Sequence, residues 1–327
     1  MSPINLSWSD AEMKRMILIM AALLLGAGLS VWGHLALSPV DTPPLPEHPK
    51  RIISLAPSIT ETLYALGLGR HIAGVTQYCL WPPQTRYKAR VAGFSDIHYE
   101  AALRVHPDLA ILPIDRGQSK EGLARLGLPT LVMDTLTLDG LTDGIKQLGR
   151  NLDREKEADQ LLTEMRKCMD WAAKRASGRK RPRVLFSVMH TYQGLGFITE
   201  INAVGKDGFY HQLIELAGGE NVYQGELAFP RLSREAIIHL NPDVIIDVIP
   251  IVQDIEAARR DWQSLSDLRA IKNGRLYFFP EEDTIPGPRF TKTLTRLSLA
   301  LHLEESGLSG LAIPQKQNTP GSKSCLN

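Results

Sequence analysis

Apolar side chains recur at steps of three and four between residues 153 and 177, and charged side chains fill the positions between them. This spacing predicts one long helix with a single apolar stripe. At about 1.5 Å per residue the helix is roughly 35 Å long, enough to cross a small domain. We expect Asp153 to cap its start and Gly178 to end it. The stripe consists of Ala158, Leu161, Leu162, Met165, Cys168, Met169, Ala172 and Ala176.

Short apolar runs typical of strands alternate with helical patterns on both sides of this segment. Buried strands are predicted where Arg51 opens RIISLAP and where Arg183 opens RVLFSVM. Strands that alternate with helices indicate parallel βαβ units. We therefore predict an α/β fold class: two Rossmann-like lobes with parallel sheets, joined by one long backbone helix. The expected boundaries are 51–152 for the N-terminal lobe, 153–177 for the linking helix and 178–311 for the C-terminal lobe.

The two predicted lobes repeat each other. Glu100 to Ile111, EAALRVHPDLAI, aligns without gaps on Glu235 to Ile246, EAIIHLNPDVII, and five of the twelve positions are identical. This repeat favours the interpretation of residues 153–177 as a rod that joins two similar lobes. An ordinary core helix is the alternative. Two lobes joined by a stiff helix leave a cleft between them, which is the usual place for a ligand.

The first 50 residues differ in character from the rest. Lys14 and Arg15 precede about 22 mostly uncharged residues, from Met16 to Leu37. We expect an export signal that is either cleaved or retained as an anchor, so that the bulk of the chain lies outside the cytoplasm. No cysteine follows the apolar run, so we expect no lipoprotein anchor. Residues 38–50 are a proline-rich linker, and residues 312–327 form an aperiodic tail expected to be disordered.

Charge, cysteine content and length limit the classes of function and fold that the chain can have. The formal net charge of +1 gives no electrostatic reason to expect nucleic acid as a partner. The three cysteines have no spacing typical of a metal site, and we expect no disulfide framework. Cys168 is interpreted as a small buried apolar residue within the helix stripe. A chain of 327 residues exceeds one hydrophobic core, which agrees with two domains.

Common catalytic motifs are missing from the sequence, including the dinucleotide fingerprint GxGxxG, the P-loop, GxSxG and HExxH. The nine histidines show no pair at spacings of three or four residues. We therefore predict a binding protein without catalytic residues, metal ligands or a resident cofactor. An exported α/β enzyme is the alternative from another functional class.

Aromatic side chains in predicted loops are the first candidates for ligand contact: Tyr78, Trp81, Phe94, Tyr192 and Phe229. Such rings supply a large contact area against flat or bulky ligands, although each can also be a local part of the core. Arg231 and Arg289 are candidates for an anionic group on the ligand, or are solvated surface arginines.

Glu100 and Glu235 occupy equivalent positions of the repeat, each in the first turn of its predicted helix. Carboxylates in that position complement the helix dipole, which is the simple interpretation. Two equivalent exposed carboxylates, one per lobe, are also suited to dock a two-fold symmetric partner through its arginines.

Several of these segments together resemble one family. RIISLAPSITETLYALG, VTQYCLWPP, AGFSDIHYEAALRVHPDLAIL and FPRLSREAIIHLNPDVII are similar to the substrate-binding proteins of ABC importers for iron–siderophore complexes, haem and vitamin B12. The resemblance covers about Arg51 to Glu304. It implies two α/β lobes, a helical backbone and delivery of a metal chelate, either a corrinoid such as cobalamin or an iron–siderophore, to a permease dimer. A ligand sensor of the same fold is the alternative within the family.

The resemblance also implies roles for individual residues. Tyr78, Phe94 and Phe229 would face the corrinoid or chelate, and Arg289, within IPGPRF, would lie near the cleft. Pro57 and Ser58, at the turn after the first strand, join these ligand-binding candidates. Glu100 and Glu235 match the pair of glutamates that dock on permease arginines. The chain is expected to be a monomer that meets the membrane only through its N-terminal segment.

Overall fold

The computed structural model describes residues 43–93, 96–114, 117–190, 196–206, 208–250 and 254–302, together with Cys325. The predicted export segment, Phe94, Tyr192 and most of the predicted tail lie outside the described residues. Among the described residues, none of the helices combines the length and the apolar character needed to cross a membrane.

The N-terminal lobe is built on a five-stranded sheet in the order β3-β2-β1-β4-β5. Every pairing in this sheet is parallel, as predicted. The strands are β1 (Ile52–Ser54), β2 (Ile72–Thr76), β3 (Ala89–Ala92), β4 (Leu109–Pro113) and β5 (Thr130–Met133). The helices of this lobe are α2 (Pro57–Ala65), η1 (Pro83–Tyr87), α3 (Tyr99–Arg104), α4 (Gly117–Arg125) and α5 (Leu138–Asn151).

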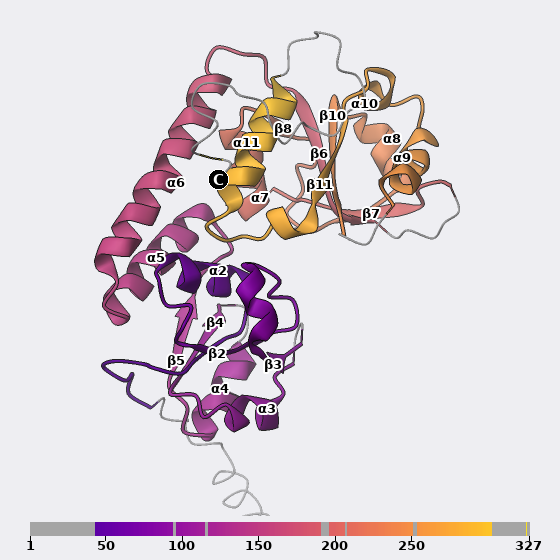
Figure 1. Ribbon diagram of the computed structural model, residues 1–327. Helices are drawn as coiled ribbons and strands as arrows, with labels where there is room; N and C mark the ends of the chain where they lie inside the picture. The colour runs from indigo at the N-terminus through magenta and orange to yellow at the C-terminus, as the bar shows by residue number, and fades with distance from the viewer. Residues whose placement is uncertain are drawn as a thin grey trace, which may run out of the picture. The chain divides into compact units, whose positions relative to one another are not determined.

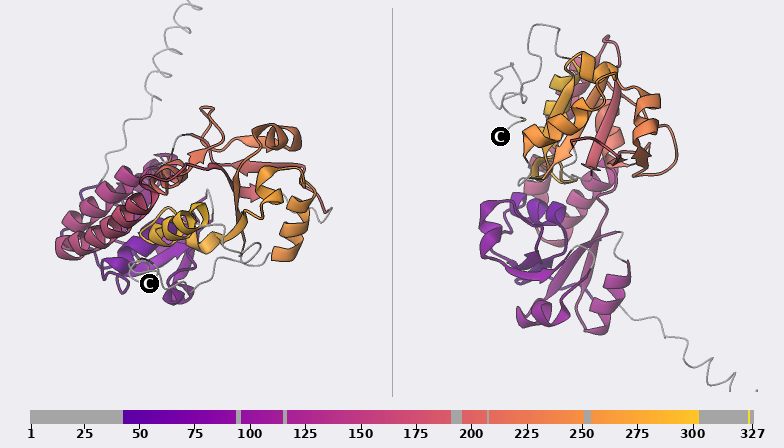
Figure 2. Two further views of the ribbon diagram at one scale, coloured as in Figure 1. Left: turned by 90° about the horizontal axis from the view of Figure 1, so that it is seen from above. Right: turned by 90° about the vertical axis from the view of Figure 1, so that its right-hand side faces the viewer.

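Strand β1 shows why its apolar residues are consecutive instead of alternating with polar ones. Successive side chains of a strand point to opposite faces of the sheet. Ile52 therefore enters one apolar cluster, shared with Ile59 of α2, and Ile53 enters another, shared with Ala102 of α3. Burial of each isoleucine stabilises the fold by about 1.5–3 kcal/mol. Helices cover both faces of this sheet (Figure 2).

The C-terminal lobe holds a six-stranded sheet in the order β11-β10-β6-β7-β9, with β8 paired to β6. Its strands are β6 (Arg183–His190), β7 (Glu200–Ala203), β8 (Glu220–Asn221), β9 (Arg231–Ser233), β10 (Val244–Ile249) and β11 (Leu276–Pro280). The helices are α7 (Phe209–Leu216), α8 (Arg234–Leu240), α9 (Ile255–Gln263), α10 (Arg269–Lys272), η2 (Glu281–Asp283) and α11 (Phe290–Leu301).

The second sheet is mixed, which differs from the fully parallel sheet expected for this lobe. Strand β7 pairs antiparallel with both β6 and β9, whereas β10 is parallel to β6 and β11. The connection between β6 and β7 is too short for the helical crossover that a parallel pair requires, and an antiparallel pair needs none. The α/β fold class is nevertheless confirmed.

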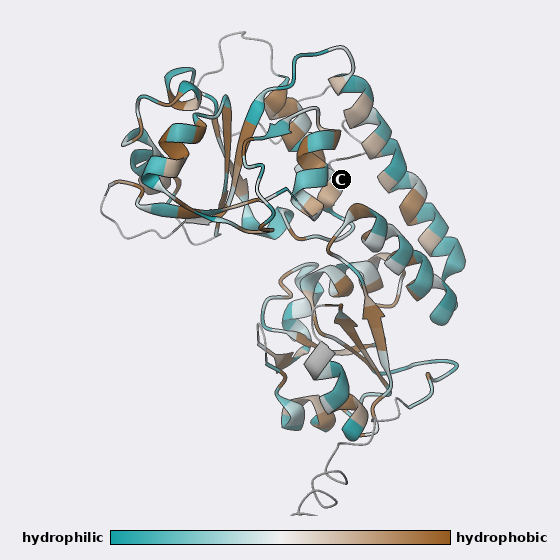
Figure 3. Cartoon of the chain, turned by 180° about the vertical axis from the view of Figure 1, so that it is seen from behind, coloured by the Kyte–Doolittle hydropathy of each residue, from teal (hydrophilic) through white to brown (hydrophobic). Residues whose placement is uncertain are grey.

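The predicted backbone helix is confirmed as α6 (Glu155–Ala176), the longest helix of the described chain (Figure 1). It packs against α5 of the N-terminal lobe and against α11 and α7 of the C-terminal lobe. Figure 3 shows hydrophilic and hydrophobic positions alternating along it, whereas the central strands are mainly hydrophobic. Gly149 permits the close approach of α5, because a Cβ there would lie 2.7 Å from the Cβ of Ala158.

Two details at this helix differ from expectation. Asp153 does not cap α6: Arg154 is the N-cap residue, and it makes no side-chain capping hydrogen bond. Asp153 instead has a positive φ of 53°, and its carboxylate Oδ2 lies 2.9 Å from Nδ1 of His48. Cys168 is not a plain apolar residue of the stripe, because it forms a disulfide with Cys325 across a Cα–Cα distance of 5.6 Å. The interpretation of Cys168 as only a small apolar residue is therefore wrong, and the chain for which no disulfide framework was expected holds this disulfide.

The sequence repeat corresponds to a repeated structure: α3 followed by β4, and α8 followed by β10. The turn after each helix contains a residue with positive φ, His106 at 45° and Asn241 at 41°. Two residues further on, Asp108 accepts a hydrogen bond from the backbone N–H of Arg51, and Asp243 accepts one from that of Arg183. In each lobe this aspartate fixes the turn to the neighbouring strand.

We expect the two lobes to move little on ligand binding. One apolar cluster runs from Ile52 of β1 through Leu162 of α6 to Val184 of β6, so a large rotation would break close packing. Small-angle scattering of the free protein and of a complex with a ligand that binds by calorimetry should differ by only a few degrees of lobe rotation. A large compaction on ligand addition would contradict this expectation.

Candidate functional site

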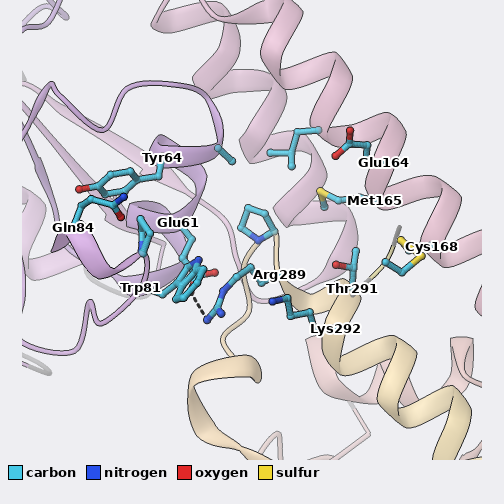
Figure 4. Close-up of a pocket in the computed structure, with 15 residues that line it drawn as sticks. Glu61, Tyr64, Trp81, Gln84, Glu164, Met165, Cys168, Arg289, Thr291 and Lys292 are labelled. Atoms are coloured by element: carbon cyan, nitrogen blue, oxygen red, sulfur yellow. Dashed lines mark ion pairs between the residues drawn. A yellow bond between two sulfur atoms is a disulfide. The ribbon is translucent and has the colours of Figure 1, made fainter. Parts of the chain in front are cut away.

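A cavity of about 450 Å³ lies where the N-terminal lobe, α6 and the start of α11 meet (Figure 4). Its volume is in the range of small-molecule pockets. Its walls are mixed, with aromatic, apolar, acidic and basic side chains. The lining residues are Glu61, Tyr64, Ala65, Trp81, Pro82, Gln84, Leu161, Glu164, Met165, Cys168, Pro288, Arg289, Thr291, Lys292 and Cys325.

Two cationic side chains lie over the indole ring of Trp81 at this cavity. The guanidinium carbon of Arg289 lies 4.6 Å from the centre of the indole ring, and the ammonium nitrogen of Lys292 lies 5.8 Å from it. Both distances are within the range at which the negative face of an aromatic ring attracts a cation. Trp81 comes from the loop before η1 and Arg289 from the N-cap of α11, so this contact joins the two lobes.

Glu61 is a buried acid in the same place. Its carboxylate reaches Arg289 with one oxygen, 3.1 Å from a terminal guanidinium nitrogen. Its other oxygen has no hydrogen-bond partner among the described residues. Burial raises the pKa of Glu61 from its usual 4.5 to about 7, and the neighbouring Arg289 opposes that rise.

Arg289 is the centre of a small network of buried charges. Besides Glu61, it contacts Asp283 at 3.3 Å, and Asp283 is also 2.6 Å from Arg296. Asp283 ends η2 and Arg296 lies on α11, so only Glu61 comes from the N-terminal lobe. The predicted role of Arg289 as an anion-binding residue must allow for this, since a ligand would meet a guanidinium that is already paired with two carboxylates.

Two further aromatic candidates are exposed but do not line this cavity. The side chain of Tyr78 is 46% exposed and that of Phe229 is 57% exposed. Phe229 rests against Tyr210, with ring centres 6.4 Å apart. The hydroxyl of Tyr210 donates to the carbonyl oxygen of Thr284, and burial raises the pKa of this tyrosine. Rings from both lobes are therefore presented to solvent outside the cavity around Trp81.

The other ligand-binding candidates have varied surroundings. Pro57 begins α2 and is half-buried, and Ser58 is buried next to Gly287, where an added Cβ would lie 3.1 Å from the Cα of Ser58. Arg231, on β9, is exposed and forms an ion pair with Glu200 of β7. Neither Ser58 nor Arg231 lines the cavity among the described residues.

Glu100 and Glu235 lie in the first turns of α3 and α8, and both side chains are exposed. Glu235 accepts a hydrogen bond of 2.8 Å from the hydroxyl of Ser233, which lowers the pKa of that glutamate. Among the described residues, neither glutamate belongs to the cavity. Both carboxylates are therefore exposed and open to a partner.

Sequence reasoning missed Glu61 and Lys292. Glu61 offered a signal, since it is the single charged residue within ITETLYALG, which is otherwise typical of a buried helix. A charged residue in such a pattern is almost always paired when it is buried. Lys292 gave no signal, because one lysine in an amphipathic helix is ordinary. In the described part of the chain, no group of three or more histidine, cysteine or acidic residues could hold a metal ion.

Comparison with known families gives a match over most of the chain. The sequence model of the periplasmic binding protein family matches residues 52–282, from β1 to η2. The matched region contains both sheets and the linking helix α6.

Individual relatives agree with this match. An uncharacterized ABC transporter substrate-binding lipoprotein of Bacillus subtilis is 27% identical over 265 residues, which cover 78% of this chain and 81% of that protein. The vitamin B12-binding protein of Pectobacterium carotovorum is 28% identical over 202 residues, which cover 61% of this chain and 71% of the relative.

Solved structures show the same fold. The periplasmic vitamin B12 binding protein of Vibrio cholerae has a TM-score of 0.69 and 23% identity, covering 80% of this chain and 100% of that chain. A periplasmic heme binding protein from Pseudomonas aeruginosa has a TM-score of 0.68 and 23% identity, covering 80% of this chain and 96% of that one. At this identity the likeness concerns the fold alone.

The raised pKa of Glu61 predicts a pH-dependent stability. A carboxyl with a pKa near 4.5 when unfolded and about 7 when folded binds more protons in the folded state between these values. The free energy of unfolding should therefore fall as pH rises through this window, by up to about 3 kcal/mol. Glu61→Gln should remove that fall, as measured by urea unfolding at pH 5 and pH 8.

Glu164→Gln is the matched control, since Glu164 is an exposed acid on the same cavity wall. This variant should keep the pH dependence of the wild type. The same slope in Glu61→Gln as in the wild type would show that Glu61 is ionised throughout the window and does not cause the effect.

Proposed function

Because this chain belongs to the periplasmic binding protein family, we propose that it is the extracytoplasmic substrate-binding component of an ABC importer for a metal chelate. The chelate is a corrinoid such as cobalamin or an iron–siderophore complex. It is captured in the cleft between the two lobes and passed to the permease. The relatives are binding proteins, and they include a vitamin B12-binding protein and a heme-binding protein.

The observation that carries this proposal is the family match together with exposed aromatic rings on both lobes. Tyr78 follows the end of β2 and Phe229 precedes β9, and in water each ring leaves a large apolar surface uncovered. Rings of this kind contribute contact area at low entropic cost against a flat or bulky ligand. Phe94 and Tyr192, which lie outside the described residues, belong to the same proposed set.

The cavity around Trp81 has a different role in this proposal. Trp81 and Glu61 hold Arg289 from the N-terminal lobe, so they fix the side chain that the C-terminal lobe sends towards the cleft. We assign Arg289, Pro57 and Ser58 to the floor of the ligand site, where α2 meets the segment around Gly287. Arg231 is retained as a candidate contact of the ligand at the rim.

Docking on the permease is assigned to Glu100 and Glu235. Each carboxylate is exposed on a short helix, and the two helices are equivalent elements of the repeated structure. Arginine side chains of two equivalent permease subunits can make charge-assisted hydrogen bonds to such a pair. The chain works as a monomer, held at the outer face of the cytoplasmic membrane or free in the periplasm after export by its N-terminal segment.

Isothermal calorimetry with cyanocobalamin, a ferric siderophore and haem, each titrated into the purified chain, tests the proposed ligand class. One-to-one binding of one of these without product formation supports a binding protein. Absence of binding by all three at micromolar protein concentration would overturn the proposed ligand class.

Phe229→Ala should weaken binding of that chelate by about 1–3 kcal/mol, because an exposed ring that covers the ligand is lost. The fold should be unaffected, since more than half of the side chain is solvent-exposed and its ring contact is to Tyr210. Phe94→Ala should act similarly. Calorimetry provides the affinities, with Tyr87→Ala as the control because Tyr87 is 78% exposed and stacks on Arg86. Wild-type affinity in the phenylalanine variants would remove them from the ligand site.

The double variant Glu100→Gln/Glu235→Gln should bind chelate normally and fail to support uptake. The two charge-assisted contacts with the permease disappear together, whereas neither glutamate lines the described cavity. Single variants should be partly impaired. Uptake by permease reconstituted in liposomes, measured beside chelate affinity, checks this prediction. If both residues serve only the helix dipole, stability falls by a few tenths to about 1 kcal/mol and uptake is unchanged.

A further inference from the structure

The helices α3 and α8 expose the same positions to solvent. Along Glu100 to Val105 and along Glu235 to Leu240, an exposed glutamate is followed by a half-buried residue, a buried residue, two exposed residues and a half-buried one. Most side chains in these two stretches differ, so the shared pattern reflects the same packing of each helix on its own sheet. The two lobes therefore present two equivalent surfaces.

An exposed aliphatic side chain recurs on each of these surfaces. Leu103 is 42% exposed and Ile238 is 48% exposed, and each stands three residues after its glutamate. Residues three apart lie on the same face of a helix. A single exposed leucine is ordinary on a protein surface. Here an aliphatic side chain lies beside a carboxylate at the same place in both lobes.

The orientation of each surface is fixed by the turn that follows it. His106 and Asn241, which occupy equivalent positions after the two helices, both have positive φ. Asp108 and Asp243 then fasten each turn to a neighbouring strand through backbone N–H groups. The glutamate and the aliphatic residue are consequently held on a defined part of each lobe, although the helices are short.

We propose that Leu103 and Ile238 are a pair of apolar anchors that seat in equivalent pockets of the two permease subunits, next to the arginines that meet Glu100 and Glu235. This inference rests on the proposed function. The occupant is a membrane permease dimer because one patch on each of two similar lobes matches a partner with two equivalent subunits. The anionic half of each patch requires that the partner present cations around its pocket.

The two halves of each patch have different physical roles. Attraction between exposed charges acts at a distance and is screened by salt, so the glutamates steer the encounter. Apolar side chains act only on contact, and salt does not screen their burial, so the anchors slow dissociation. The two contributions can therefore be separated by ionic strength.

The test compares two double variants of the full chain: Leu103→Ser/Ile238→Ser and Glu100→Gln/Glu235→Gln. The host's ABC permease, identified by co-purification with the wild-type chain, is freed of that chain and reconstituted in nanodiscs. It is the binding partner at 50 mM and 500 mM salt, concentrations at which the Debye length is about 14 Å and about 4 Å. The serine variant should bind roughly 10- to 100-fold more weakly at both salt concentrations, through faster dissociation. The glutamine variant should lose affinity mainly at low salt, through slower association.

Two controls make the comparison specific. Leu45→Ser/Leu136→Ser removes aliphatic side chains that are 42% and 53% exposed and lie outside both helices, and it should bind like the wild type. Leu103→Met/Ile238→Met keeps the apolar character and should retain most of the affinity. Chelate affinity of every variant, measured by calorimetry, should match the wild type and shows that the lobes are folded.

Wild-type binding by the serine variant, together with weak binding by the glutamine variant, would overturn the anchors and leave the proposed function intact. Equal weakening of the serine variant and of Leu45→Ser/Leu136→Ser would lead to the same conclusion. Wild-type binding by both double variants would overturn the anchors and also the docking role of the two glutamates.

Discussion

The structure depends on one constraint: the apolar stripe of α6 has to be buried by both lobes at once. Ala158, Met165 and Ala172 are buried along its length, where α5 packs from one lobe and α11 and α7 from the other. Because the interior is close-packed, a change in the angle between the lobes would open space along this stripe. The helix therefore acts as a stiff connection, and any adjustment to a ligand falls to side chains and loops at the junction.

The ion pairs at this junction explain how the lobes are aligned across the cavity. Arg289 of the C-terminal lobe lies between Glu61 and the ring of Trp81, both of the N-terminal lobe. Burying such charges costs desolvation free energy, which their mutual attraction roughly offsets, so the network adds little net stability. Its geometric demands are strict, however, because removing one partner leaves the other charge buried and unpaired. The raised pKa of Glu61 is the sign of that cost.

The periodicity of apolar residues predicted the helices and strands whose burial follows a local sequence pattern. The apolar stripe located α6, and the consecutive apolar residues of β1 indicated a strand buried on both faces. Contacts between residues that are far apart in the sequence could not be predicted from periodicity. The pairing of Cys168 with Cys325 joins residues 157 positions apart, and the short strands β7 and β9 carry too little pattern to reveal an antiparallel pair. Trp81 and Arg289 were identified individually, but their stacking depends on how two lobes are packed together.

Under the proposed function, the repeat distinguishes the parts of the chain that would meet a symmetric partner from those that would meet an asymmetric ligand. The helices α3 and α8 expose the same pattern, which suits two equivalent subunits. The loop that supplies Tyr78 and Trp81, in contrast, lies between Gly69 and Glu100, where the first lobe has 15 more residues than the second lobe has between Gly219 and Glu235. A chelate has no two-fold symmetry to match, so its contacts are free to differ between the lobes. Under the proposed function, divergence is therefore expected at the ligand cleft, while the symmetry of the permease would keep the proposed docking surfaces alike.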